Sequence, residues 1–144
     1  MNIQSIRQFN RDLTVYLGVY DRNLFGLHYP MIALRILMEI DNHHGITANQ
    51  LVNDLQFDKG YLSRIINQLV TDKVVVKKQD VNDRRRWQLF TTDKGHQYAK
   101  VINQKSDERV QSLLNKLDNE ERQFVFKSIN LLQNALNELN GENH

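Results

Sequence analysis

Residues 80–95 of this 144-residue chain read DVNDRRRWQLFTTDKG, so a charged turn runs directly into an apolar strand. Alternate residues of a strand face the same side, which places Trp87, Leu89 and Thr91 on one face. The β-branched run at residues 74–78 predicts a partner strand. With the turn-rich residues 79–85 between them, the two strands form a predicted hairpin. It carries three consecutive arginines, and Trp87 and Leu89 are expected to anchor it to the core.

Three short helices are predicted ahead of this hairpin. Pro30 suits the first turn of a helix, where its missing N–H costs nothing. Thr47 and Gln50 have the spacing of a capping box, and Asp58 is a candidate N-cap for the next helix. The positions expected to be buried are Ala33, Ile36, Leu37, Ile40, Leu51, Val52, Leu55, Leu62, Ile65, Ile66 and Leu69. The sequence therefore predicts a helix-turn-helix followed directly by a hairpin.

The helix after Asp58 has an unusual polar face. At 100° per residue, the side away from its apolar stripe presents Gly60, Ser63, Arg64, Asn67, Gln68 and Thr71. This face has no carboxylate, although a solvated helix usually includes one for i,i+4 pairing. Hydroxyls, amides and a guanidinium can bond base edges and phosphate oxygens, so the face is a candidate nucleic-acid surface. An ordinary polar surface is the alternative, and Gly60 either permits close approach of a partner or has no such role.

Positive charge is concentrated in the middle of the chain. The net formal charge is only +2, but residues 58–95 contain nine Lys and Arg against five Asp, a net of +4. Residues 104–144 contain five Lys and Arg against seven Asp and Glu, a net of −2. This distribution is typical of an electrostatic footprint on an anionic partner.

Two heptad-like apolar stripes lie near the ends of the chain. The first, on a helix predicted over residues 3–24, comprises Ile6, Phe9, Leu13, Tyr16 and Tyr20. The second, on a final helix that Asp118 and Glu121 would cap, comprises Val125, Ile129, Leu132, Leu136 and Leu139. Another long helix is expected to begin at Thr92 or Asp93 and to run through Leu113 and Leu117. The stripes could pack inside one monomer, but so short a chain has little other core for them to cover. We therefore expect them to pack between two copies.

The composition argues against several classes of protein. The chain has no cysteine, which excludes disulfides and thiolate metal sites and favours a cytoplasmic protein. No apolar run approaches the roughly 20 residues that span a bilayer, so no membrane partner is expected. There is no glycine-rich phosphate loop or close acid pair, so we expect neither an enzyme nor a cofactor. A metal site built from His28, His43 or His44 is a minor alternative to surface or core histidines.

Two stretches resemble the MarR family of winged-helix transcription regulators. Residues 58–65, DKGYLSRI, are similar to that family's recognition helix, and the run from Asp83 to Gly95 is similar to its wing signature, which closes on Thr-x-x-Gly. The resemblance extends over nearly the whole chain. Two departures concern Thr91, which stands where leucine is usual, and Phe90, which stands where a polar residue is common. Either the strand is shifted or Phe90 serves another surface.

The resemblance implies a mainly α fold with a small β-hairpin wing, in which a winged helix-turn-helix is flanked by N- and C-terminal dimerisation helices. Residues 1–144 would form one domain, with a DNA-binding lobe at 30–92 and dimerisation helices at 1–29 and 93–144. By that pattern Arg85 borders the minor groove and Asp83 orients it. The implied DNA-binding residues are Lys59, Gly60, Tyr61, Ser63, Arg64, Asn67, Gln68, Arg84, Arg85 and Arg86. The implied dimerisation residues are Ile6, Phe9, Leu13, Val125, Ile129, Leu132 and Leu136.

Function follows from the resemblance as an expectation. It implies a homodimer that binds a pseudo-palindromic duplex operator, with repression as the favoured sign of regulation. A small anionic or aromatic effector would bind in a cavity between the dimerisation helices and each lobe. The alternative is a winged-helix module that docks a partner protein and never contacts DNA. Salt dependence discriminates the two, because only binding built on phosphate contacts must weaken steeply as salt rises.

Overall fold

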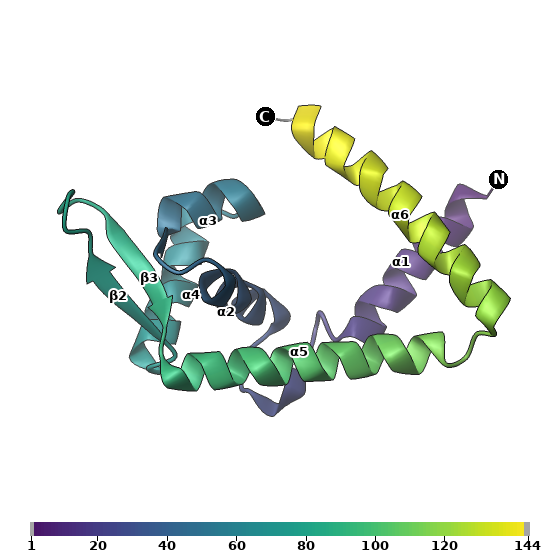
Figure 1. Ribbon diagram of the computed structural model, residues 1–144, viewed down its shortest axis with the longest axis horizontal. Helices are drawn as coiled ribbons and strands as arrows, with labels where there is room; N and C mark the ends of the chain where they lie inside the picture. The colour runs from purple at the N-terminus through teal and green to yellow at the C-terminus, as the bar shows by residue number, and fades with distance from the viewer. Residues whose placement is uncertain (1, 143–144) are drawn as a thin grey trace. The chain divides into compact units, whose positions relative to one another are not determined.

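The computed structural model describes residues 2–142. Met1 and residues 143–144, which belong to the terminal segments predicted to dimerise, lie outside the described residues. The described residues form six α-helices and three strands (Figure 1). In chain order these are α1 (Ile3–Leu17), α2 (Met31–Asn42), β1 (Ile46–Thr47), α3 (Ala48–Leu55), α4 (Lys59–Thr71), β2 (Val75–Gln79), β3 (Trp87–Thr91), α5 (Asp93–Leu114) and α6 (Asn119–Glu142). A short 3₁₀ turn occupies Leu24–Gly26. The predicted fold class, mainly helical with a small hairpin, is confirmed.

The chain divides into two compact units, one that extends to Lys105 and one that begins at Ser106. The first unit contains α1 to β3 and most of α5, and the second contains the end of α5 and all of α6. The division of the chain into a DNA-binding lobe at 30–92 and flanking dimerisation helices stays a prediction. None of the described helices is long and apolar enough to cross a membrane.

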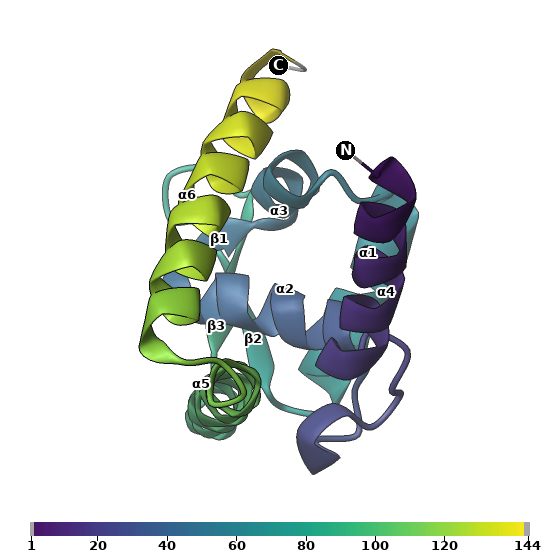
Figure 2. The same ribbon diagram turned by 90° about the vertical axis from the view of Figure 1, so that its right-hand side faces the viewer.

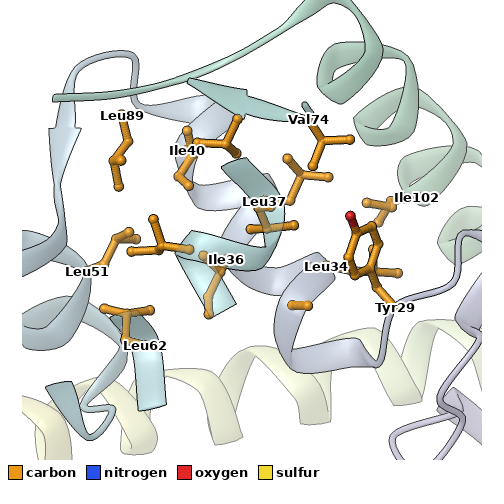
Figure 3. Packing of buried hydrophobic residues seen from close by; sticks show 14 of the residues in the cluster. Tyr29, Leu34, Ile36, Leu37, Ile40, Leu51, Leu62, Val74, Leu89 and Ile102 are labelled. Carbon is orange, nitrogen blue, oxygen red and sulfur yellow. The ribbon is translucent and has the colours of Figure 1, made fainter. Parts of the chain in front are cut away.

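The core of the first unit is built on the apolar faces of α2, α3 and α4. Ile36, Leu37 and Ile40 of α2 are fully buried, and they meet Leu51 of α3 and Leu62 of α4 (Figure 3). Val74, Val75 and Leu89 extend this cluster to the sheet, and Ile102 brings in α5. The i, i+3, i+4 spacing predicted from the sequence therefore identifies the main buried positions.

The helix beginnings follow the predicted caps. The Thr47 hydroxyl accepts from the Gln50 backbone N–H, and the Gln50 side chain accepts from the Thr47 N–H, which completes a capping box at α3. Asp118 and Glu121 form the same reciprocal pair at the start of α6, with both bonds at 2.9 Å. These bonds satisfy donors that a helix start leaves open, so each helix begins where its cap lies.

The sheet is antiparallel in the order β1-β3-β2. The predicted hairpin is present, with Lys77 paired to Leu89 and Gln79 to Trp87. The two-residue strand β1 joins its other edge, where Ile46 pairs with Leu89. In Figure 1 the hairpin projects from the α2–α4 cluster, and Figure 2, which views α5 nearly end-on, shows the base of the sheet beside that helix.

The structure corrects two predicted helix ends. The helix predicted over residues 3–24 ends at Leu17, because Gly18 adopts a left-handed conformation (φ 81°) and its N–H bonds back to the last turn. Tyr20 therefore lies beyond α1 and does not continue its stripe. The helix predicted to run through Leu117 ends at Leu114, after which the backbone turns toward the Asp118 cap.

Candidate nucleic-acid interface

Helix α4 begins at a well-defined cap. The Asp58 carboxylate accepts from the backbone N–H of Tyr61 at 2.9 Å. A Cβ on Gly60 would lie 3.3 Å from the same carboxylate oxygen, closer than most such contacts. Glycine at this position therefore leaves room for the cap, which gives Gly60 a structural reason that the sequence alone did not reveal.

The exposed face of α4 is polar and lacks acidic groups, as predicted. Leu62, Ile66 and Leu69 are buried against the core. The exposed residues of the helix are Lys59, Gly60, Tyr61, Ser63, Arg64, Asn67, Gln68 and Thr71. The guanidinium of Arg64 lies 5.8 Å from the centre of the Tyr61 ring, a cation–π contact that restricts where the side chain can point. The structure thus brings these predicted residues onto one surface.

Gln68 is engaged within its own helix end. Its Nε2 lies 3.1 and 3.0 Å from the two carboxylate oxygens of Asp72, the C-cap of α4. Tyr29, just before α2, donates its hydroxyl to the same carboxylate. The hydrogen bond from Gln68, and to a smaller extent the bond from Tyr29, lowers the pKa of Asp72. Burial, followed by the bond to Asp72, raises the pKa of Tyr29. This network fastens the C-terminal end of α4 to the segment that leads into α2.

The hairpin tip is shaped by bonds from side chains to the backbone. Asp80 accepts from the N–H of Asn82 at 2.9 Å, and Gln79 Nε2 donates to the carbonyl of Arg84 at 2.6 Å. The backbones of Asp80 and Arg86 are joined at 2.9 Å across the turn. The arginines are therefore presented on a closed turn with a defined backbone path.

Within that turn, Asp83 contacts Arg85. Its Oδ1 accepts from the Arg85 backbone N–H at 3.0 Å and lies 3.4 Å from the Arg85 Nε. The Arg85 side chain is 92% exposed, so the ion pair by itself stabilises the fold little. The side chains of Arg84 and Arg86 are also exposed. The geometry allows Asp83 to direct Arg85, as the family pattern implies.

Two residues of the hairpin differ from expectation. Trp87, predicted to anchor the strand, is 50% exposed, because only Leu89 in the middle of β3 reaches the packed core. Trp87 instead lines a cavity of about 330 Å³ between α4 and the hairpin, together with Ala48, Ser63, Ile66, Lys77 and Leu89. Lys77 was missed by the sequence analysis: its Nζ donates to Oδ1 of Asn67 at 3.2 Å. The one feature that could have indicated this contact is the strand register, which pairs Lys77 with buried Leu89.

The two departures from the family pattern also have local explanations. Thr91 donates its hydroxyl to Asp41 at 2.8 Å, and His96 Nδ1 lies 3.0 Å from the same carboxylate oxygen. Phe90 points to the opposite face of the sheet, where its ring stacks on His44 with 6.4 Å between centroids. Thr91 is thus held by Asp41 of α2, and Phe90 lies on the other face of the sheet beside His44.

The histidines are not gathered in one place. His43 lies 3.6 Å from Glu39, and His96 pairs with Asp41. Across residues 2–142 no three His, Cys, Asp or Glu side chains are close enough together to hold a metal ion. The possible metal site therefore finds no support in the described part of the chain.

The predicted dimerisation stripes are largely uncovered within their own units. Phe9 of α1 is 58% exposed and Leu132 of α6 is 65% exposed. Ile6, Ile129 and Leu136 are exposed to a similar degree, and Leu13 and Val125 are partly buried.

A family model for the MarR family matches residues 25–86, which contain the helix-turn-helix and the hairpin turn described above. This stretch of the chain is a MarR-family helix-turn-helix and hairpin turn. The MarR family comprises winged helix-turn-helix, DNA-binding transcription regulators.

Two transcription regulators are similar to this chain in sequence. Over 120 residues, 83% of this chain, it is 28% identical to a transcriptional regulatory protein for the hcr operon of Thauera aromatica. Over 61 residues, 42% of this chain, it is 33% identical to the HTH-type transcriptional regulator BilQ of Clostridioides difficile. The matched stretches span 66% and 41% of those relatives' own lengths.

The fold of this chain is also that of solved structures. Streptococcus pneumoniae FabT, solved in complex with DNA, superposes with a TM-score of 0.81 at 18% identity. The match covers 96% of this chain and 99% of FabT. At that identity the likeness shows a shared fold.

Proposed function

We propose that this MarR-family chain is a sequence-specific regulator that binds duplex DNA as a homodimer on a pseudo-palindromic operator. The observation that carries the proposal is the surface formed by α4 and the hairpin. The helix exposes hydroxyls, amides and cations with no carboxylate among them, and the hairpin beside it presents three exposed arginines. The DNA in the FabT structure agrees with such a role for this fold.

In this proposal, α4 recognises bases and the hairpin binds the DNA backbone or the minor groove. An α-helix fits the major groove, where amides and guanidinium groups can bond distinct base edges. The hairpin arginines neutralise phosphates or enter the narrow minor groove of A·T-rich steps, whose negative potential favours an arginine. Of the proposed contacts, we assign base recognition to Ser63, Arg64 and Asn67, and we assign backbone binding to Lys59 and the arginines.

The homodimer is proposed from the exposed apolar stripes. Side chains as large as Phe9 and Leu132 cover little of the core of their own units. An exposed apolar stripe along a helix is often part of an interface. Packing the stripes between two copies would bury it and place two copies of α4 for an operator with two-fold symmetry.

The sign of regulation is proposed to be repression, since a dimer seated across an operator excludes other proteins from the same DNA. Release by a small anionic or aromatic effector is proposed from the family resemblance.

The test starts from fragmented genomic DNA incubated with the purified protein, followed by sequencing of the bound fragments. We expect one enriched inverted repeat. Its affinity should fall about 10³-fold or more between 50 and 200 mM salt if six or more phosphates are contacted. Absence of any enriched sequence, or affinity that ignores salt, would contradict the proposal and favour a protein-interaction module.

A further inference from the structure

We infer that Lys77, on the hairpin, sets the base preference of Asn67, on α4, and that the pair selects guanine over adenine at one position of each half-site. This inference rests on the proposed function, because it names what one part of the DNA surface recognises. It begins from the 3.2 Å bond between Lys77 Nζ and Asn67 Oδ1.

The strand register explains why Lys77 reaches α4. Lys77 is paired with Leu89, which is 1% exposed, and paired residues of neighbouring strands project to the same face. Lys77 therefore lies on the side of the hairpin that faces the core and α4, where its stem borders the cavity shared with Ser63 and Trp87. Lys78, one residue later, lies on the other face, with its Nζ 5.1 Å from the centre of the Phe90 ring.

The bond fixes the orientation of the Asn67 amide. An ammonium group has donors only, so the atom of Asn67 that faces Lys77 must be the carbonyl oxygen. The amide NH₂ then points elsewhere and presents hydrogen-bond donors. Both residues are exposed, so the combined pair offers an ammonium and an amide NH₂ side by side to a ligand.

This array of donors favours one base edge over another. A free asparagine reads adenine with two bonds, because its oxygen accepts from N6–H and its NH₂ donates to N7. Beside Lys77 that oxygen is engaged, and its remaining lone pair would bring the adenine N6 amino group against the ammonium. Guanine presents two adjacent acceptors, O6 and N7, and can receive both donors. Loss of Lys77 should therefore restore the adenine preference of Asn67.

The test uses Lys77→Met, which keeps the stem over the cavity and removes the ammonium. Lys78→Met is the matched control, because it removes the same charge from the opposite face. Bound duplexes are selected from a randomised pool by wild type and by both variants, and affinities are then measured on operators that differ only at the affected position. Thermal unfolding of each variant confirms that it folds.

We expect wild type to prefer guanine at one position per half-site. Lys77→Met should shift the guanine-to-adenine affinity ratio there by about 10-fold toward adenine, the scale of one bidentate contact. Lys78→Met should leave the ratio unchanged. An unchanged ratio in Lys77→Met, with equal loss on all sequences, would make Lys77 a phosphate contact and overturn the inference. If wild type selects no sequence at all, the proposed function fails first, which is a different result.

Discussion

The carboxylate of Asp83 accepts the backbone N–H of Arg85 at 3.0 Å and lies 3.4 Å from its guanidinium Nε, within a turn of exposed cations. An acidic residue at this place should repel the DNA phosphates. Its position instead suits a role in orienting Arg85. Without this contact, the Arg85 side chain would sample many directions in solvent.

Replacing Asp83 by alanine should therefore weaken operator binding although it removes a negative charge. Arg85→Ala should weaken it as well and lower the salt slope by about one unit for a lost phosphate contact. The measurement is affinity for one operator at several salt concentrations. Asp54→Ala is the control, since it removes the same charge from α3, and it should bind as wild type or tighter. Tighter binding of Asp83→Ala at every salt would leave only a diffuse positive patch.

Arg64 should contribute to sequence preference. Its guanidinium is held over the Tyr61 ring on the exposed face of α4, so it is directed before DNA arrives. Arg64→Ala should weaken the preferred operator by roughly 1–3 kcal/mol more than random duplex. Competition binding with both duplexes measures the difference. Lys100→Ala, an exposed cation of α5, should change neither affinity. Equal losses on both duplexes for Arg64→Ala would reassign it to phosphate.

Gly95 should be needed for the fold. A Cβ there would lie 2.0 Å from the Val74 carbonyl oxygen, where the base of the hairpin meets α5. The Thr92 hydroxyl accepts from the Gly95 N–H and donates to the Lys73 carbonyl, so the Thr-x-x-Gly motif joins the two elements. Gly95→Ala should lower stability by about 3 kcal/mol or more, as measured by thermal or urea unfolding.

Gly141→Ala provides the comparison for Gly95. No atom lies within 4 Å of a Cβ at position 141, which is in helix α6. That substitution should be neutral or stabilise the protein by up to about 1 kcal/mol. Similar small effects at both glycines would show that the hairpin base can relax.

Self-association should depend on the terminal stripes. Leu132→Asp or Phe9→Asp places a charge on surface proposed to be buried between copies, so it should shift the molecular mass in solution from dimer toward monomer. Val81→Asp is the control, because Val81 is an apolar residue at the hairpin tip that is even more exposed than Phe9 and Leu132 and lies outside both stripes. Sedimentation equilibrium distinguishes the species. Dimers that persist at low micromolar concentration in both stripe variants would contradict the assignment.

The sequence predicted the elements whose signals are local. Asp58 and the Thr47–Gln50 capping box identified the starts of two helices, because a cap depends on residues within four positions of one another. The two-residue strand β1 was missed because periodicity cannot be read from two positions. The end of α1 was misplaced because Tyr20 continues the apolar spacing past Gly18, whose left-handed backbone overrides it.

The candidate site was predictable for residue types and less so for their contacts. The exposed face of α4 follows from helical geometry, so Arg64 and Asn67 were found. The contact of Lys77 with Asn67 depends on which face of the strand is turned toward α4. The bond from Gln68 to Asp72 depends on where α4 ends. Trp87 was expected to be buried from its hydrophobicity, but its place near the hairpin tip lies beyond the packed core.

The central claim is that two copies of the α4–hairpin surface grip one duplex symmetrically, and the spacing of the operator tests it most directly. Half-site centres should lie roughly 10 bp apart, one turn of the double helix. Affinity is measured for the selected operator and for a version with five base pairs inserted at its centre, which turns one half-site to the opposite side of the duplex. We predict that the insertion reduces affinity to near that of a single half-site. Unchanged affinity for the altered operator would contradict the account.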